Sequence, residues 1–325
     1  MIAQEGYAIG IDLGGTNVRV GAVSPQGHLL VVQSAPIEAT LGPKVGVEKI
    51  ITLVEAIQNQ VKTGGLLSIG IGSTGPVDRI RGRIQNPYTL PTWDDVDILS
   101  PLVQRFDVPA TLENDADAAA LGEAWVGSGC GYKSMVQVTV GTGIGVGFIQ
   151  DGKVYRGKNG LHPEGGHMIL DLNGPEDYCG AHGCWEVLAS GPAMEHYARK
   201  VCAEQGGLML QMCGGDLQTL NGWMIVKAAR LGDPTALTVI AQMGRYHGLG
   251  IVNLLLTYLP DCIVLGGGVM REYDLFLPHI RSVLCQHNKV TPAAEIEILP
   301  SRLGGQAGVL GAAYAALFFV EENTL

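Results

Sequence analysis

The chain has 325 residues, which is long enough for two modest domains or one large one. Apolar residues make up 46% of it, enough for a packed core and too many for a wholly disordered chain. The net charge of −10 argues against a general affinity for nucleic acid or anionic membranes. Because no signal-peptide pattern precedes Tyr7 and no apolar run reaches the roughly 20 residues that span a bilayer, we expect a cytoplasmic protein.

The seven cysteines do not suggest a disulfide framework, because their number is odd and the chain carries no export signal. Five of them stand alone among apolar or loop residues, where cysteine often serves as a small buried hydrophobe. We therefore expect burial of Cys130, Cys202, Cys213, Cys262 and Cys285. The other two cysteines lie close together in a glycine-rich turn.

The first part of the chain alternates between strand and helix signals. A strand, a glycine turn and a return strand are predicted over Tyr7–Val23, followed by a helix over Val45–Val61 with apolar residues at helical spacing. A buried strand over Leu67–Ile71 then leads into a turn at Gly75-Pro76. This alternation favours an α/β layered domain.

A second pair of strands joined by glycines repeats the pattern of the first. An alanine-rich helix over Ala116–Trp125 precedes this pair, whose strands are predicted over Met135–Val140 and Gly145–Gln150. The repetition of a strand, a Gly/Thr loop and a strand predicts two related domains that face each other across a cleft. From Gly191 onward the pattern is mostly helical.

The C-terminal part adds a third glycine turn. The run Cys262–Gly268 predicts a strand that ends in three consecutive glycines, and Gln306–Val320 predicts a helix of small and apolar residues. No low-complexity segment or long linker separates the elements. We therefore expect the two domains to share an extensive interface.

The glycine loops have the composition of phosphate-binding loops. Glycines let backbone N–H groups approach phosphate oxygens, and short polar side chains add hydrogen bonds. The carboxylate in the first loop is placed to hold Mg²⁺ beside bound phosphates. One such loop alone is more typical of a glycine hairpin without a ligand, but three together favour a nucleotide. The candidate residues are Asp12, Gly14, Gly15, Thr16, Asn17, Thr142, Gly143, Gly267 and Gly268.

Asp115 is the candidate general base. It follows the apolar-leaning run Val108–Leu112 and comes just before the alanine-rich helix, where a strand meets a helix. Phosphoryl transfer to an alcohol needs a carboxylate that orients the hydroxyl and accepts its proton. Asn114 or Asp115 also suits the N-cap of the helix, and the two roles are compatible.

A histidine and two cysteines form a candidate zinc site. His167, Cys179 and Cys184 are suitable ligands for tetrahedral Zn²⁺, with the two cysteines inside a glycine turn. Asp177 is the favoured fourth ligand and His182 the weaker candidate. A reduced, metal-free turn is the alternative interpretation.

The zinc site would fix the surrounding loop. Glu164 and Glu186 would then point into the cleft, where their carboxylates accept hydrogen bonds from sugar hydroxyls. The sequence indicates no role for His162 and His196.

Six stretches together resemble the ROK sugar kinases (repressor, open reading frame, kinase), a branch of the actin-like ATPase superfamily. They are Asp12–Asn17, Leu112–Ala116, Thr139–Gly145, Glu164–His167, Cys179–Glu186 and Leu265–Gly268. The resemblance covers essentially the whole chain and implies a two-domain α/β fold of the actin-like ATPase (ribonuclease H-like) type with an interdomain cleft. We expect a small domain over residues 1–124 and 302–325 and a large domain over residues 125–301.

The resemblance also implies roles for individual residues. Asp115 would be the catalytic base, and the two Gly/Thr loops would hold the ATP phosphates. His167 would serve both as a zinc ligand and as a sugar contact. The family pattern has a cysteine where this chain has Asp177, so the zinc site departs from that pattern. The implied sugar contacts are Gly75, Asn114, Asp115, Glu164, His167 and Glu186.

These features predict an ATP-dependent hexose kinase that makes glucose 6-phosphate, with Mg²⁺ and a structural Zn²⁺ as cofactors. Ser73–Gly75 and the cysteine loop are also similar to N-acetylmannosamine kinases, so an N-acylhexosamine or another hexose is the alternative substrate, and polyphosphate is the alternative donor. The non-enzyme alternative is a sugar-sensing regulator, which the retained Asp115 disfavours. We expect no nucleic-acid or membrane partner, and a homodimer or homotetramer as in the family.

Overall fold

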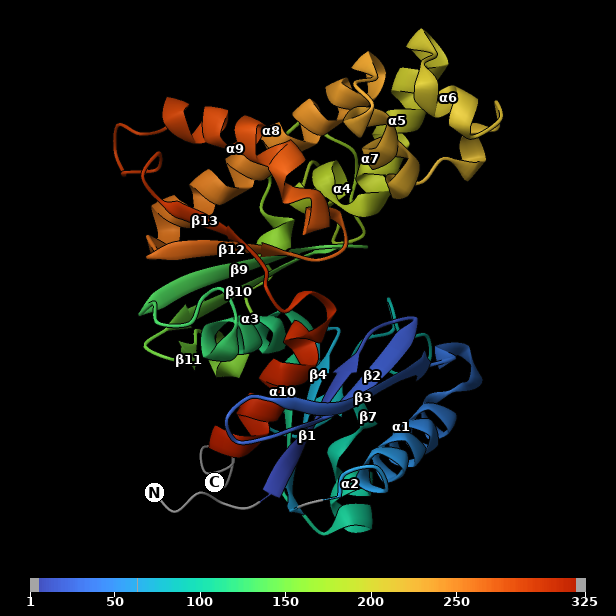
Figure 1. The fold of residues 1–325 in the computed structure, drawn as a ribbon, viewed down its shortest axis with the longest axis vertical. Coiled ribbons are helices and arrows are strands. Elements are labelled where there is room, and N and C mark those ends of the chain that lie inside the picture. Colours follow the sequence, from blue (N-terminus) through green and yellow to red (C-terminus); the bar gives the residue numbers. More distant parts are fainter. Residues whose placement is uncertain (1–5, 63, 320–325) are drawn as a thin grey trace. The chain divides into compact units, whose positions relative to one another are not determined.

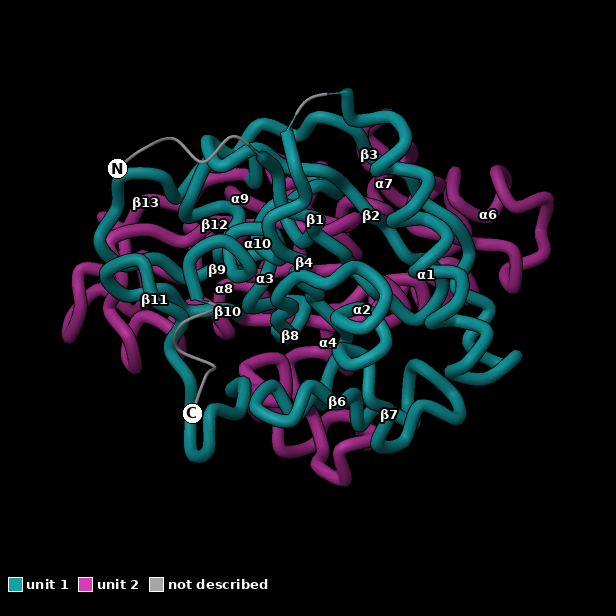
Figure 2. The backbone as a smooth tube through the Cα atoms, turned by 90° about the horizontal axis from the view of Figure 1, so that it is seen from below, with its two compact units in different colours: residues 1–137, 147–163, 301–325 teal, residues 138–146, 164–300 magenta. Residues whose placement is uncertain are grey.

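The structure is a computed structural model, and it describes residues 6–62 and 64–319. The chain divides into two compact units (Figure 2). Unit 1 comprises residues 1–137, 147–163 and 301–325, and unit 2 comprises residues 138–146 and 164–300. The domain boundaries expected from the sequence, after residues 124 and 301, stay a prediction.

Unit 1 is built on a five-stranded sheet in the order β3-β2-β1-β4-β8 (Figure 1). β2 is antiparallel to β1 and β3, whereas β4 is parallel to β1 and β8. The register places Ser73 beside Asn114, so the ends of β4 and β8 lie together. The strands are β1 Gly6–Leu13, β2 Asn17–Val23, β3 Leu29–Pro36, β4 Gly65–Ser73 and β8 Ala110–Asn114.

The side chains of β1 alternate between a bulky face and a small face of this sheet. Ile9 and Ile11 lie in the main core of unit 1, which also includes side chains of α1 (Pro43–Gln58) and α2 (Leu99–Phe106). On the other face, a Cβ added at Gly10 would lie 1.9 Å from the carbonyl oxygen of Val309. The bulky face therefore packs against α1 and α2, and the small face lets the C-terminal helix approach closely (Figure 1).

The C-terminal helix α10 (Ala307–Phe318) also packs against α3 (Asp115–Val126). A Cβ added at Gly311 would lie 1.6 Å from the carbonyl oxygen of Ala118, so the two backbones are in direct contact there. Val320, the last residue that the sequence predicted for this helix, lies outside the described residues.

The second sheet has the order β11-β10-β9-β12-β13, and the boundary between the two units runs through β9 and β10. In both sheets the strands follow the same pattern, with a hairpin on one side of the first strand and later strands on its other side. This common order agrees with the internal repeat seen in the sequence. The strands are β9 Ser134–Val140, β10 Ile144–Gln150, β11 Lys153–Val154, β12 Cys262–Gly266 and β13 Glu297–Pro300.

Unit 2 is mostly helical from Trp185 onward, as the pattern after Gly191 predicted. Two of its helices begin at side-chain caps followed by proline, an arrangement that satisfies free N–H groups of the first turn. Ser190 caps α5, and Asp233 caps α8. The helices are α4 Trp185–Ala189, α5 Gly191–Gln205, α6 Leu208–Met212, α7 Gly222–Arg230, α8 Pro234–Tyr258 and α9 Tyr273–Gln286.

Short elements complete the fold. A small antiparallel sheet of β5 (Val77–Asp78), β6 (Arg83–Ile84) and β7 (Val96–Asp97) follows β4 in the chain. Among the described residues, no helix is both long and apolar enough to cross a membrane. The 3₁₀ helices are η1 Ala39–Leu41, η2 Lys158–Gly160, η3 Gly165–His167, η4 Leu217–Thr219, η5 Val269–Glu272 and η6 Gly304–Gln306.

The prediction that five lone cysteines are buried was wrong for two of them. Cys202, Cys213 and Cys262 are buried, whereas Cys130 and Cys285 are exposed. Cys130 lies in the turn that follows α3, and Cys285 lies near the end of α9, next to the buried face of that helix. An isolated cysteine in an apolar or loop sequence can therefore lie in the core, in a turn or on the exposed side of a helix.

Candidate active site

Asp115 lies at the junction of β8 and α3 in unit 1, and it is the first residue of α3. Asn114 is the N-cap: its side-chain oxygen accepts hydrogen bonds from the N–H groups of Ala116, at 2.8 Å, and Asp117, at 3.4 Å. Asn114 is therefore the N-cap residue, and Asp115 Oδ1 accepts a hydrogen bond from the same Ala116 N–H at 2.9 Å. This cap fixes the backbone at the start of the helix, and with it the position from which the Asp115 carboxylate extends.

Asp12 lies near the start of α10 in unit 1, where a Cβ added at Gly308 would be 3.0 Å from Asp12 Oδ1. Its carboxylate forms an ion pair with Arg19 of β2, with Oδ2 and Nη1 3.1 Å apart. Burial raises the pKa of Asp12 above its ordinary value, and the Arg19 guanidinium opposes this effect. Arg19 was not predicted as a site residue from the sequence, although it lies two residues after the end of the loop motif at Asn17.

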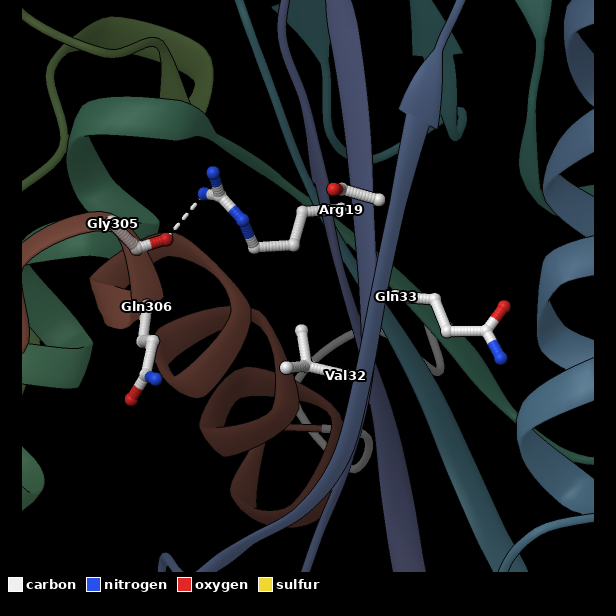
Figure 3. Close-up of a pocket in the computed structure, with 6 residues that line it drawn as sticks. Arg19, Val32, Gln33, Gly305 and Gln306 are labelled. Carbon is white, nitrogen blue, oxygen red and sulfur yellow. Dashed lines mark hydrogen bonds between the residues drawn. The ribbon is translucent and has the colours of Figure 1, made fainter.

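An open pocket of about 270 Å³ lies beside this ion pair. Figure 3 shows Arg19 reaching from β2 toward the start of α10, where it donates a hydrogen bond to the carbonyl oxygen of Gly305. The guanidinium therefore links the first glycine loop to the C-terminal helix. The residues that line the pocket are Arg19, Val32, Gln33, Ser34, Gly305 and Gln306.

The turn after β4 contains Gly75, whose peptide bond to Pro76 is cis. Its neighbour Thr74 contacts the Thr89 hydroxyl at 3.2 Å, and the buried Asn86 donates to that hydroxyl at 2.6 Å. Thr89 also lies against the first glycine loop, because a Cβ added at Gly15 would be 2.7 Å from its carbonyl oxygen. Unit 1 thus brings together the first glycine loop and the turn that carries Gly75.

Unit 2 brings the other two glycine loops together. Gly267 has a φ of 88°, in the left-handed region that favours glycine. A Cβ added there would lie 2.2 Å from the carbonyl oxygen of Val140, so the turn with Gly267 and Gly268 lies against the end of β9. Thr142 and Gly143 form the turn that directly follows this strand.

Glu186 contacts the same turn from α4. Its Oε2 accepts a hydrogen bond from the Ile144 N–H at 2.7 Å, and a Cβ added at Gly143 would be 2.4 Å from that oxygen. Burial raises the pKa of Glu186, while the Ile144 N–H opposes this shift. Glu164 is the residue before η3, and this turn lies against β10, since a Cβ added at Gly166 would be 2.0 Å from the Ile144 carbonyl oxygen.

The four predicted zinc ligands converge in unit 2. One donor atom from each of His167, Asp177, Cys179 and Cys184 lies within 4.8 Å of the others. The two sulfurs are 3.5 Å apart, and His167 Nδ1 is 2.7 Å from Asp177 Oδ2. His182 is not in this group and contacts the Gly174 carbonyl oxygen instead, which agrees with its lower rank as a ligand.

The two nitrogens of His167 face different partners. Nδ1 faces the cluster, whereas Nε2 contacts the Tyr178 hydroxyl at 3.0 Å. Burial favours the neutral acid of Asp177, but hydrogen bonds from Cys179 and His167 outweigh it and hold the pKa of Asp177 below its ordinary value. Burial also raises the pKa of Cys184 to about 12, so a metal ion would have to displace its proton.

Trp185 anchors the helix that carries Glu186. Its indole N–H donates a hydrogen bond to Nδ1 of the buried His247, at 3.2 Å. Burial lowers the pKa of His247 to about 3, so the ring is neutral and Nδ1 is free to accept. No sequence motif indicates this pair, whose members lie 62 residues apart.

Several charged residues around Asp115 also had no predicted role. Glu113 contacts Arg79 and Arg156, and His162, to which the sequence assigned no role, contacts Asp117. Their partners are between 34 and 45 residues away in the chain, so no local motif reveals them.

The model of the ROK family matches residues 8–318, nearly the whole chain. The chain belongs to the ROK family. This ROK protein is 33% identical over 316 residues to a glucokinase of Streptomyces coelicolor, with 95% of the chain and 96% of the relative covered. It is also 29% identical over 310 residues to a xylose repressor of Bacillus subtilis, with 95% of the chain and 76% of the relative covered.

Among solved structures, the ROK protein is similar to a ROK family glucokinase from Streptomyces griseus in complex with glucose and AMPPNP. The TM-score is 0.83 and the identity 31%, over 96% of this chain and 99% of the relative. The fold is therefore the α/β actin-like ATPase fold that the sequence motifs predicted.

Proposed function

We propose that this ROK protein is an ATP-dependent hexose kinase that converts glucose into glucose 6-phosphate. The observation that carries the proposal is the position of Asp115, a carboxylate at the start of α3 with its backbone fixed by the Asn114 cap. The similarity to a glucokinase over 96% of that relative supports the sugar, and the relative solved with glucose and AMPPNP supports the donor.

Asp115 is the general base in this proposal. Its carboxylate orients the sugar hydroxyl and accepts the proton as the oxygen attacks the γ-phosphorus of ATP; the bond from this phosphorus to the bridging oxygen breaks and ADP leaves. Asn114, Gly75, Glu164, His167 and Glu186 are the proposed sugar contacts. Carboxylates and an imidazole nitrogen accept hydrogen bonds from sugar hydroxyls, so this set orients the ring for transfer to one oxygen.

The glycine loops are the proposed phosphate-binding groups, and backbone N–H groups are well suited to phosphate oxygens. Asp12 is the residue proposed to hold Mg²⁺, which supplies positive charge to the phosphates during transfer. The Arg19 guanidinium fits this role, because it holds the Asp12 carboxylate in place and favours its ionised form. The loop residues are Gly14, Gly15, Thr16, Asn17, Thr142, Gly143, Gly267 and Gly268.

The cluster of His167, Asp177, Cys179 and Cys184 is proposed to hold a structural Zn²⁺. The donor set fits, because tetrahedral Zn²⁺ takes sulfur, nitrogen and carboxylate oxygen ligands, and these donors already converge. When bound, the ion would cross-link the loop before α4. His167 Nδ1 would serve the metal and leave Nε2 for a sugar hydroxyl, which supports the double role implied by the family resemblance.

Replacing Asp177 by cysteine tests this zinc site. We expect Asp177→Cys to retain zinc at least about tenfold more tightly against a chelator than the parent protein, because structural zinc sites favour thiolates. Zinc content by elemental analysis and zinc release to a chromogenic chelator measure this. Glu176→Cys adds a thiol at the adjacent exposed position and is expected to leave release unchanged, whereas Cys184→Ser should speed it. Equal release from Asp177→Cys and the parent protein would argue against zinc here.

The sugar is tested by coupled assays of turnover on glucose, N-acetylmannosamine, fructose and allose. We expect the highest kcat/KM with glucose and ATP. Negligible turnover of glucose beside a good rate on another sugar would replace the proposed substrate, and a higher rate with polyphosphate would replace the donor. Light scattering on the same samples tests the expected homodimer or homotetramer.

A further inference from the structure

A buried carboxylate just before Asp115 is bound by two arginines. Glu113 is 1% exposed, and its two oxygens contact different partners. Oε1 is 3.1 Å from Nε of Arg79, and Oε2 is 2.6 Å from Nη2 of Arg156. Both arginines are largely buried themselves, so the three charges form one compact group within unit 1.

A second buried pair lies just after Asp115. Asp117 is 3% exposed in the first turn of α3, and its Oδ1 is 2.9 Å from Nδ1 of His162. The His162 side chain is 7% exposed. Two buried carboxylates, Glu113 and Asp117, therefore lie two positions before and two positions after the proposed base. Each of them contacts a basic side chain from residues 156–162.

Arg156 and His162 are the first and last residues of one short segment that follows β11. We call this segment, residues 156–162, the strap. The strap is closed on itself, because the N–H of Gly157 donates a hydrogen bond to the carbonyl oxygen of Leu161 at 2.8 Å. Asn159 and Gly160 have φ values of 58° and 75°, which asparagine and glycine adopt more readily than other residues. The strap is thus a compact loop with a defined geometry.

We infer that the strap is a positioning element for the sugar, held at its two ends by the carboxylates that flank Asp115. The inference rests on the function proposed above. Arg79, which also contacts Glu113, closely follows the turn that carries Gly75, a proposed sugar contact. One buried charge group therefore joins the strap, the start of α3 and this turn.

Stability alone does not account for such pairs. Buried ion pairs often contribute no more to stability than apolar residues of the same size, because desolvation offsets their attraction. The ion pairs restrict the positions of the segments that they join, however, because Glu113 Oε1, Glu113 Oε2 and Asp117 Oδ1 each contact one basic side chain. Near a reacting group, a displacement of about 1 Å can cost on the order of a hundredfold in rate, so the restriction has a direct catalytic value.

Steady-state kinetics of strap variants tests the inference. We expect Glu113→Gln and His162→Leu to raise KM for glucose about tenfold or more while KM for MgATP stays within about twofold. His162→Asn retains a donor close to the position of Nδ1 and is expected to recover most of the loss. A purely structural role would not divide the two KM values in this way.

A matched control lies in the same helix. Glu123 is fully buried near the end of α3 and accepts hydrogen bonds from the N–H groups of Ser128, at 2.7 Å, and Leu303, at 3.1 Å. Glu123→Gln is expected to lower the melting temperature without changing KM for glucose. If His162→Leu does not fold, the double variant His162→Leu/Asp117→Leu removes both partners and leaves no unpaired buried charge. It is expected to show the same rise in KM for glucose.

The outcomes separate the inference from the function on which it rests. Absence of turnover on every sugar in the parent protein would overturn the proposed kinase, and the strap role with it. An active parent protein whose folded strap variants keep KM for glucose within about twofold, or shift both KM values equally, would overturn the strap role alone. A rise confined to glucose, with recovery in His162→Asn, would support it.

Discussion

Asp115→Asn is expected to lower kcat at least about a hundredfold while the affinity for glucose stays within about tenfold of that of the parent protein. The amide keeps the size and hydrogen-bonding reach of the carboxylate, so the sugar still binds. It cannot accept the proton of the attacking hydroxyl, so the chemical step slows. Pre-steady-state turnover and isothermal titration with glucose measure the two effects separately.

Asp107→Asn is the matched control for this charge change. Asp107 is an exposed residue at the C-terminal end of α2 with a φ of 52°, a conformation that asparagine tolerates, so the variant should fold and turn over normally. An Asp115→Asn protein with most of its turnover would refute the assigned role of Asp115. A parent protein that binds glucose without phosphorylating it would instead support the sugar-sensing alternative.

Gly311→Ala is expected to destabilise the protein by about 2 kcal/mol or more. The added methyl group would lie 1.6 Å from the carbonyl oxygen of Ala118, so α10 and α3 have to move apart. Severe overpacking of this kind lowers the free energy of unfolding by about 3 kcal/mol. The better helix propensity of alanine raises it by only about 1 kcal/mol. Urea unfolding followed by circular dichroism measures the net loss.

Gly65→Ala is the control for a glycine that has space. No atom lies within 4 Å of a Cβ added at Gly65, so its free energy of unfolding should change by no more than about 0.5 kcal/mol. If Gly311→Ala is as stable as Gly65→Ala, the close approach of α10 and α3 is not present in solution.

Local signals in the sequence were sufficient for the elements that carry the predicted site. The β1–β2 hairpin, the start of α3 and the strand before Gly267 are all marked by glycine turns or capping residues, which act over a few residues. β3 was not predicted, although the turn at residues 24–27 precedes it, because it lies at the edge of the sheet and its sequence does not alternate between apolar and polar residues.

The same distinction holds for the candidate site. His167, Asp177, Cys179 and Cys184 lie within 18 positions of one another, and their chemistry alone predicted that they converge, which they do. The pairing of Arg156 with Glu113 spans 43 residues and depends on the packing of β11 and α3. Such contacts are set by the tertiary fold, and ordinary arginines and histidines give no sign of them in the sequence.

The place of α10 has a consequence for biosynthesis. It covers the small face of a sheet whose first strand is made about 290 residues earlier, so at 5–20 residues per second the two are translated roughly 15–60 s apart. During that interval the nascent chain on the ribosome exposes Ala8, Gly10 and the neighbouring apolar surface. Unit 1 therefore buries its smaller core cluster only at the end of translation, whereas its main core is built from residues 7–112 and is contiguous in the chain.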